Sequence, residues 1–418
     1  MKLVHSFDKK IIVWLVVLFA LVVFVSSGAA LSWEEAAALA DTQNNELKSA
    51  KYQLEAYRWS YNRAFSSFLP QLSAGMSMGE SVDPPAPDVT KSYSYSLTAT
   101  QYLFRGLDSL YDLQTAYANY QYYKFNLDKT VSDVYYSVRL AYIDLFVAQK
   151  NVEQQKSIVA RRKENTRLIQ LRYESGKEDK GSLLLTKADQ AESEYELAAA
   201  LRELKLAQLK LSQLLNVDVS GVDALSAAYL SAVPDFAALT EGSPAYNMAR
   251  YQLEAAEIAQ KSTIGGFLPS VSLSGNYSNG DSVWPPDSAS NSWSLNVSYS
   301  FFPGGSNLAD RAIYGAQLDK AREDFVKNKK DLSYAIEQAD INFKDAIESY
   351  QVKQTYLEAT KTRAEISRAK YLNGLTSYYE WDQIENAYIA AERYVLIYQK
   401  AALQSEAAWH NSYGGLIK

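Results

Sequence analysis

Side chains that could do covalent or metal chemistry are scarce in this chain of 418 residues. It contains no cysteine and only two histidines, His5 and His410. Nucleophile triads and zinc sites depend on these residue types, so neither has enough material here. Neighbouring carboxylates occur at Glu34-Glu35, at Glu178-Asp179 and at Glu380 with Asp382. Because most charges on long helices are solvated and phosphate-binding glycine motifs are absent, we predict no enzyme, no metal site and no cofactor.

The first 30 residues have the layout of a secretory signal. A basic start at Lys2, Lys9 and Lys10 precedes an apolar run from Ile11 to Val25, and small residues follow at 28–30. A spanning helix needs about 20 apolar residues, which is more than this run offers, so an uncleaved anchor is only the alternative. We therefore predict an exported protein.

Composition narrows the class further. The whole chain carries a net charge of −6, and because residues 1–30 contribute +2, the remainder carries −8. Nucleic-acid binding needs a basic footprint, which this chain lacks. An exported protein without cysteines has no disulfides, so its stability must come from packing. The 32 tyrosines suit membrane belts and wet interfaces, or the core of a coiled coil.

The elements that would position these residues occur twice. Phe68-Leu69-Pro70 recurs as Phe267-Leu268-Pro269, Phe104-Arg105-Gly106 recurs as Phe302-Pro303-Gly304, and Arg172-Tyr173 with Gly176 recurs as Lys370-Tyr371 with Gly374. Three landmarks thus keep one spacing, 198 or 199 residues, across half of the chain. This is a tandem duplication, and it indicates two halves of one object.

Each half contains a very long segment without helix breakers. No Gly or Pro lies between Gly106 and Gly176, and Gly315 is the only one from Ser306 to Asn373. A helix of about 69 residues would be roughly 100 Å long at 1.5 Å per residue. Shorter arms with coiled-coil spacing follow at 182–220 and 375–413. We predict two long antiparallel helical hairpins.

Between the helices the apolar period changes to two. Residues 92–100 and 292–299 alternate, as do their upstream partners 72–79 and 271–277, with polar loops at 82–91 and 279–291. One face is apolar and the other is mostly Ser, Thr, Asn and Gly. A soluble β-sandwich gives the same alternation, but it needs more than four strands, and four cannot close a barrel around a channel. Transmembrane barrels have this pattern, and strand edges cannot stay unpaired in lipid. Several chains should therefore share one barrel.

Taken together, these features resemble the TolC-like outer-membrane efflux protein family over about residues 33–413. The resemblance rests on the order of the motifs: the entry helix from Leu31-Ser32-Trp33, the two Phe-Leu-Pro corners, the exits at 101–106 and 299–305, and the Arg/Lys-Tyr-x-x-Gly turns. It implies a homotrimer with a 12-stranded β-barrel in the outer membrane and an α-helical tunnel in the periplasm. It also implies a periplasmic adaptor and, through that adaptor, an inner-membrane transporter as partners.

The expected organisation has five parts. They are a signal peptide at 1–30, a first repeat at 31–216, an equatorial linker at 217–242, a second repeat at 243–413 and a tail at 414–418. The first repeat should contain a β-hairpin at 71–104 and a helical hairpin at 107–216. The second should contain a β-hairpin at 270–302 and a helical hairpin at 306–413. The fold class is mostly α with a small β part.

The resemblance also assigns roles to single residues. Aligned on Gly374, the aperture tyrosine of the family corresponds to Tyr371, and its first acidic ring position corresponds to Glu380. The second acidic ring position is occupied by Gln383 and the basic gate position by Thr376, so this sequence departs from the family's closing network at both. Asp382 lies beside Gln383 but on another face of the helix. Pro70 and Pro269 match the swivel prolines, and Gly106 and Gly304 match the exits from strand to helix. The expected adaptor contacts are Arg172, Tyr173, Gly176, Leu183, Tyr371, Gly374, Leu375 and Ser377.

We therefore predict a passive outer-membrane channel-tunnel of a tripartite efflux or type I secretion system, gated at the helix tips. The alternative is a periplasmic coiled-coil adaptor or scaffold without a membrane barrel. The sequence does not specify the exported substrate.

Overall fold

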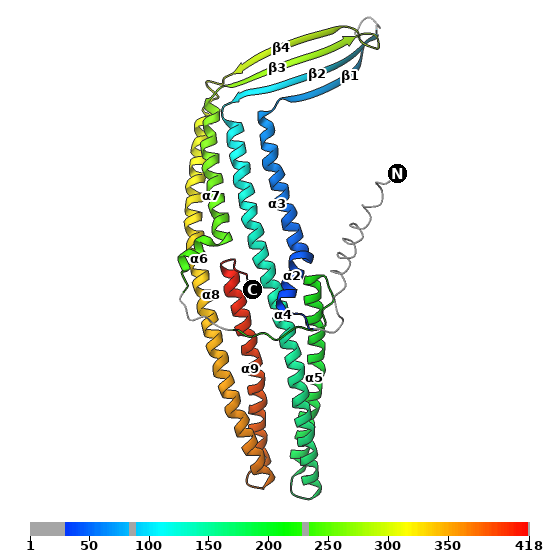
Figure 1. Ribbon diagram of the computed structural model, residues 1–418, viewed down its shortest axis with the longest axis vertical. Helices are drawn as coiled ribbons and strands as arrows, with labels where there is room; N and C mark the ends of the chain where they lie inside the picture. Colours follow the sequence, from blue (N-terminus) through cyan, green and yellow to red (C-terminus); the bar gives the residue numbers. More distant parts are fainter. Residues whose placement is uncertain (1–29, 83–88, 228–233, 417–418) are drawn as a thin grey trace, which may run out of the picture.

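A computed structural model describes residues 30–82, 89–227 and 234–416. The predicted signal, the tips of two loops and the end of the tail lie outside these residues in whole or in part. The molecule is elongated, with a four-stranded sheet at one end and the turns that close the two helical hairpins at the other (Figure 1).

The elements of the first half are α2 (Trp33–Gln43), α3 (Asn45–Ala64), η1 (Phe65–Phe68), β1 (Gln71–Val82), β2 (Val89–Arg105), α4 (Asp108–Glu174) and α5 (Lys180–Leu215). Those of the second half are α6 (Phe236–Gly242), α7 (Pro244–Ser262), η2 (Thr263–Phe267), β3 (Ser270–Asp281), β4 (Ala289–Ser298), α8 (Ser306–Leu372) and α9 (Tyr378–Ser412).

The sheet is antiparallel, with the order β1-β2-β3-β4. Strands β2 and β3 join the two repeats, and a register shift between Tyr102 and Phe104 lets β2 continue to Arg105. The hairpin ladders extend into the predicted loops, to Val82↔Val89 and Asn279↔Ala289. Backbone pairing does not need apolar side chains, so the polar residues that suggested loops still form strand. Strands β1 and β4 are the two edges.

One strand is shorter than predicted. The second β-hairpin was expected to reach residue 302, but β4 ends at Ser298, which pairs with Ser270. Pro269 precedes Ser270 and has no N–H to donate, so residues beyond 298 have no ladder partner on β3. Tyr299, Phe301 and Phe302 consequently follow β4 as exposed residues outside the sheet.

The helices form two tiers that share α4 and α8. Next to the sheet the helices lie in the order α3, α4, α7, α8, and in the other tier the order is α5, α4, α9, α8 (Figure 1). Helices α4 and α8 have 67 residues each and run through both tiers. Helix α5 ends at Leu215, one residue before the predicted end of the helical hairpin at 216, because Asn216 adopts a left-handed conformation at φ 52°.

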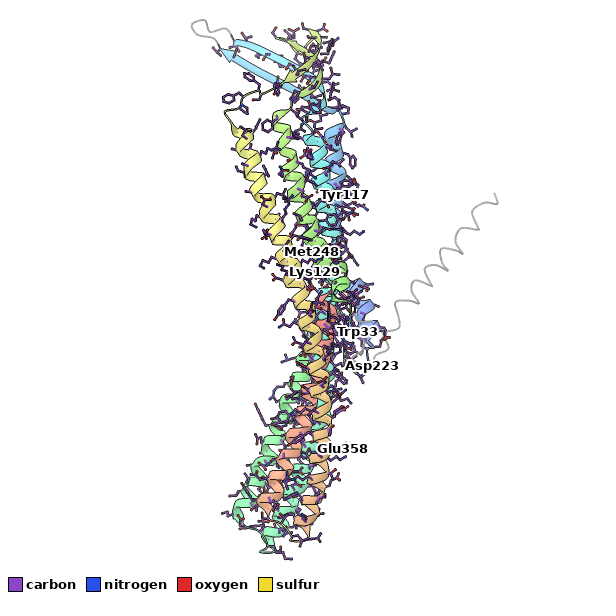
Figure 2. All side chains as sticks on the ribbon, turned by 90° about the vertical axis from the view of Figure 1, so that its left-hand side faces the viewer. Trp33, Tyr117, Lys129, Asp223, Met248 and Glu358 are labelled. Carbon is purple, nitrogen blue, oxygen red and sulfur yellow. The ribbon has the colours of Figure 1, made fainter. Side chains whose placement is uncertain are left out.

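The start of the linker after α5 meets Leu31 at the middle of the molecule, at the level where Figure 2 shows Trp33 and Asp223, and we call this junction the belt. Leu31 pairs in parallel with Val222, and the Tyr142 hydroxyl donates to the Leu31 carbonyl at 2.7 Å. The Gln149 side chain accepts from the Val222 N–H at 2.9 Å. The largest buried cluster surrounds this belt, with Trp33, Tyr142, Leu211 and Leu215 in its interior. The same cluster includes Leu403 of α9, so the belt lies where the two hairpins pack together.

Candidate functional site at the helix tips

Two turns of the same geometry close the helical hairpins. Gly176 has φ 71° and Gly374 has φ 75°, a backbone region that favours glycine. After each glycine a backbone N–H returns to the last helical turn, from Lys177 to Arg172 O at 2.8 Å and from Leu375 to Lys370 O at 2.9 Å. This pairing is the usual glycine termination of a helix. Asp179 then caps α5 through its side chain, and Ser377 caps α9.

An aromatic cluster, here called the tip cluster, lies directly above the turns. Tyr371 is only 1% exposed, and its ring stacks on Trp381 with 4.7 Å between centroids. The edge of Tyr378 meets both rings. Ile169 and Leu183 complete the cluster from the other hairpin. The cluster therefore joins α4 and α5 to α8 and α9 at their far ends.

Polar contacts cross the same junction. The Tyr371 hydroxyl donates to Glu178 Oε2 at 2.6 Å, and Glu178 belongs to the turn of the first hairpin. The Arg172 guanidinium lies 4.5 Å from the Tyr371 ring centroid, and its Nη1 donates to the Tyr371 carbonyl at 3.4 Å. The Tyr378 hydroxyl shares a hydrogen bond of 2.9 Å with Thr186 Oγ1.

These surroundings perturb both tyrosines. Burial, and then the hydrogen bond to Glu178, raise the pKa of Tyr371 far above its usual range. Burial raises the pKa of Tyr378 to about 12. Both phenols therefore remain protonated at neutral pH, and Tyr371 stays a hydrogen-bond donor.

The structure separates the four predicted aperture residues into two groups. Tyr371 is buried in the tip cluster, and Asp382 points inward to Arg162, with 3.5 Å between Oδ1 and Nη1. Glu380 and Gln383 are exposed on another face of α9. Glu380 accepts from Thr376 Oγ1 at 2.6 Å, and its own N–H donates to Ser377 Oγ. A step of three residues keeps 380 and 383 on one face of the helix, whereas a step of two turns Asp382 away.

The predicted adaptor contacts also divide by exposure. Tyr173, Gly176, Gly374, Leu375 and Ser377 are exposed, and Arg172 is half-buried. For Leu183 the expected exposure at the tip was wrong, as it was for Tyr371. The Leu183 side chain is 8% exposed because it packs in the tip cluster. The exposed apolar residues that sequence reasoning missed are Leu171, Leu184, Leu372 and Tyr379. Their signal was an apolar side chain next to a turn glycine or in the first turn of a helix.

A second contact between the hairpins was also missed. Helices α4 and α9 are antiparallel, and charged pairs recur along their contact from Arg139–Glu406 and Asp144–Lys400 to Arg161–Glu392. Six charged side chains of α4, α5 and α9 gather next to the tip cluster, on its side away from the turns, and we call them the polar seam. They are Arg161 and Arg162 of α4, Asp189 of α5, and Asp382, Glu385 and Glu392 of α9. Sequence alone shows the charges but not which of them face a partner helix.

The predicted corners lie where helices meet strands. Pro70 stands between η1 and β1, and Pro269 between η2 and β3. Gly106 and Gly304 have φ 59° and 68° just before the long helices. A Cβ on Gly106 would lie 2.8 Å from the Gly265 carbonyl oxygen, so this turn needs glycine for space as well as for its φ angle.

Two further observations concern the described residues alone. They contain no group of His, Cys, Asp or Glu side chains arranged to hold a metal ion. They also contain no helix that combines the length and apolarity needed to span a bilayer.

Comparison with known proteins identifies the family of this chain. The model of the outer membrane efflux protein family matches residues 37–217 and 238–415. A search of curated proteins found no match. Among solved structures the chain is similar to CusC, described in connection with transmembrane channel formation, at 17% identity and a TM-score of 0.83, covering 92% of each chain.

Two further channels share the fold. The Campylobacter jejuni CmeC outer membrane channel is 16% identical with a TM-score of 0.80, covering 92% of this chain and 86% of that one. The open state of the Neisseria gonorrhoeae MtrE outer membrane channel is 17% identical with a TM-score of 0.80, covering 92% and 89%.

Proposed function

Because this chain belongs to the outer membrane efflux protein family, we propose that three copies form a channel-tunnel across the outer membrane and the periplasm. The family is one of efflux channels, which provide a passage and are not enzymes. We place the sheet in the outer membrane and the helical tiers in the periplasm. The duct would serve a tripartite efflux or type I secretion system, receiving substrates from an inner-membrane transporter through a periplasmic adaptor.

The observation that carries this proposal is the pair of open edges on the chain. Among the described elements, β1, α3 and α5 form one side, and β4 and α8 form the other. Strand edges cannot remain unpaired in lipid, where each unsatisfied backbone group costs several kcal/mol. Two different edges that face opposite ways make a head-to-tail contact, which closes into a ring. Three copies would supply twelve strands.

Apolar side chains support the same contact between the helices. Helix α8 exposes a stripe along its length, formed by Val326, Tyr334, Ile341, Val352, Tyr356 and Ile366. Helix α5 exposes Leu184, Tyr195, Leu206 and Leu209. Rows of exposed apolar side chains such as these are typical of protein interfaces. Here the partner would be the next copy, with α5 of one chain beside α8 of its neighbour.

The test is fractionation followed by measurement of mass. The channel should be recovered from the outer membrane as a trimer that resists detergent and separates into monomers on heating. The alternative function, a periplasmic adaptor or scaffold without a barrel, predicts recovery in the soluble periplasmic fraction. Recovery only as a soluble monomer would refute the channel proposal.

We place the gate at the tip cluster. The Tyr371–Glu178 hydrogen bond and the Arg172 contacts support this assignment, because they tie one hairpin to the other where the tunnel would end. Glu380 and Gln383 are exposed beside it, and three symmetric copies would present a ring of Glu380 carboxylates. Such a ring favours cations.

We place adaptor docking on the exposed surface of the two turns. Tyr173, Leu375 and Tyr379 offer apolar area there, with 38%, 75% and 72% of each residue exposed. Both turn glycines are exposed, and nothing lies within 4 Å of a Cβ built on either of them. A partner could therefore approach the backbone closely at both turns.

A further inference from the structure

The polar seam carries a surplus of negative charge. Its four carboxylates face two guanidinium groups, so the six side chains sum to −2 when all are ionised. The surrounding charged groups do not remove this surplus. Arg368 of α8 acts on Glu385, Glu192 of α5 acts on Asp189, and Arg393 of α9 pairs with Glu196 of α5, which together add no net charge. The phenols of Tyr378 and Tyr388 also face the seam.

One carboxylate of the seam is buried, the other three are half-buried, and their charge is incompletely compensated. Glu385 is 7% exposed, and its Oε1 accepts no hydrogen bond within the described residues. Arg161 Nε lies 3.5 Å from that oxygen, an ionic contact without hydrogen-bond geometry. Asp189 Oδ2 is in the same situation, 3.4 Å from Arg162 Nη1. A buried carboxylate without full compensation is costly while it is ionised.

The seam is also accessible to protons. An open groove of about 330 Å³ between α4, α5 and α9 reaches the seam. Arg162 and Asp189 line this groove together with Asn386. A carboxylate here can therefore exchange protons with the surrounding solution while the hairpins remain packed together.

The geometry points to a proton-controlled latch between the two helical hairpins. Proton uptake by the surplus carboxylates of the seam holds α9 against α4 and α5, and ionisation of these groups favours their separation. This inference rests on the proposed function, because separation of the hairpins near their tips is the motion that would widen a tunnel. The latch is distinct from the Tyr371–Glu178 link, which is closer to the turns.

The direction of the effect follows from the carboxyl groups. Burial is the largest influence on Asp189, Asp382 and Glu385 and raises the pKa of each above its usual range, although the neighbouring guanidiniums act in the opposite sense. An acid with a raised pKa in the closed state binds more protons there than in the open state. The closed state is therefore most stable below the ordinary carboxyl range and loses stability as the pH rises to the raised values.

The test measures the distance between the hairpins in the full-length protein. Because the chain has no cysteine, fluorophores can be attached through Lys187→Cys on α5 and Ala387→Cys on α9, both exposed and outside the seam. A small fraction of doubly labelled chains is diluted into unlabelled chains, so that energy transfer reports one chain. As the pH rises from about 4, in the ordinary carboxyl range, to 8, we expect the labels to separate. The ratio of closed to open chains should fall about tenfold per pH unit for each proton released.

Two variants separate the latch from a merely structural contact. The double variant Asp382→Asn with Glu385→Gln should stay closed and lose most of the pH response. Arg162→Gln should move the transition to higher pH, because the guanidinium lowers the pKa of both Asp382 and Asp189. The matched control replaces Asp324 and Asp331 of α8 with asparagine, since both are exposed carboxylates paired with lysines, and it should behave as the unmodified chain.

Each outcome decides the matter. Equal label distances at about pH 4 and at pH 8, or an unchanged pH response in the double variant, would overturn the latch. If the double variant does not fold, the Arg162→Gln transition decides, and no upward shift would also overturn it. A monomeric but folded chain would refute the proposed trimer while the labels still report on the latch.

Discussion

The Tyr371–Glu178 hydrogen bond provides the sharpest test of the proposed gate. Replacing Tyr371 with phenylalanine removes a single hydroxyl and keeps the ring. The stack on Trp381 and the cation–π contact with Arg172 should survive, because both depend on the ring. The change therefore isolates one contact between the hairpins.

The magnitude follows from the nature of that contact. A hydrogen bond to a charged group contributes about 1.5–3 kcal/mol to the state that contains it. Glu178 is half-buried and regains water when its donor is lost, which places the effect near the lower bound. About 1.5 kcal/mol corresponds to roughly a tenfold fall in the ratio of closed to open gate for each chain.

The assay is single-channel recording of the purified protein in planar bilayers at neutral pH. Tyr371→Phe should increase the open probability or the conductance, and thermal unfolding should change little. The matched control is Tyr379→Phe, since Tyr379 lies in the first turn of α9, next to Tyr378 of the tip cluster, but is 72% exposed. Equal conductance of Tyr371→Phe and the unmodified channel would refute the assignment of the gate to this link.

Three further predictions concern the same end of the molecule. Replacing Gly176 and Gly374 with valine forces L residues into a left-handed conformation, at a cost of roughly 1–2 kcal/mol each. Transport and adaptor crosslinking should then both be lost, and intact export would contradict docking at the turns. Glu380→Gln should reduce the preference for cations in reversal-potential measurements. Because the Glu380 side chain is exposed, the melting temperature should stay nearly unchanged. An unchanged ion selectivity would exclude Glu380 from the constriction. Trp381→Ala should destabilise the tip by about 3–5 kcal/mol, detectable as faster proteolysis of the turns, whereas equal cleavage rates would argue against a packed cluster.

The duplicated pattern made the fold predictable from the sequence. The long segments without Gly or Pro could only be long helices, and the alternation of apolar and small polar residues could only be strand. The exact ends were harder to predict. The ladder continues to Val82↔Val89 through polar residues, and β4 stops at Ser298 because its partner strand begins after Pro269. Both ends depend on the neighbouring strand, which a single segment of sequence does not show.

The tip residues show a similar limit. Tyr371 was identified from its distance to Gly374, but its burial was not, because burial depends on Trp381 stacking from α9 and Leu183 packing from α5. Spacing within one helix predicts which residues share a face. It does not predict which face meets another hairpin more than 150 residues away in the chain.

The two contacts between the hairpins differ in what they can respond to. The tip cluster is apolar, and its buried tyrosines stay protonated at neutral pH, so it would hold the gate closed at every physiological pH. The polar seam has a surplus of carboxylates, so its strength must depend on protonation. At the middle of the molecule the belt at Leu31 and Val222 and the large core around Tyr142 hold both hairpins in place. Separation must therefore grow from that level toward the turns, and full opening has to break the tip cluster as well as the seam. A change in pH alone should loosen the hairpins without fully opening the tunnel, and a partner bound at the exposed turns would supply the remaining free energy.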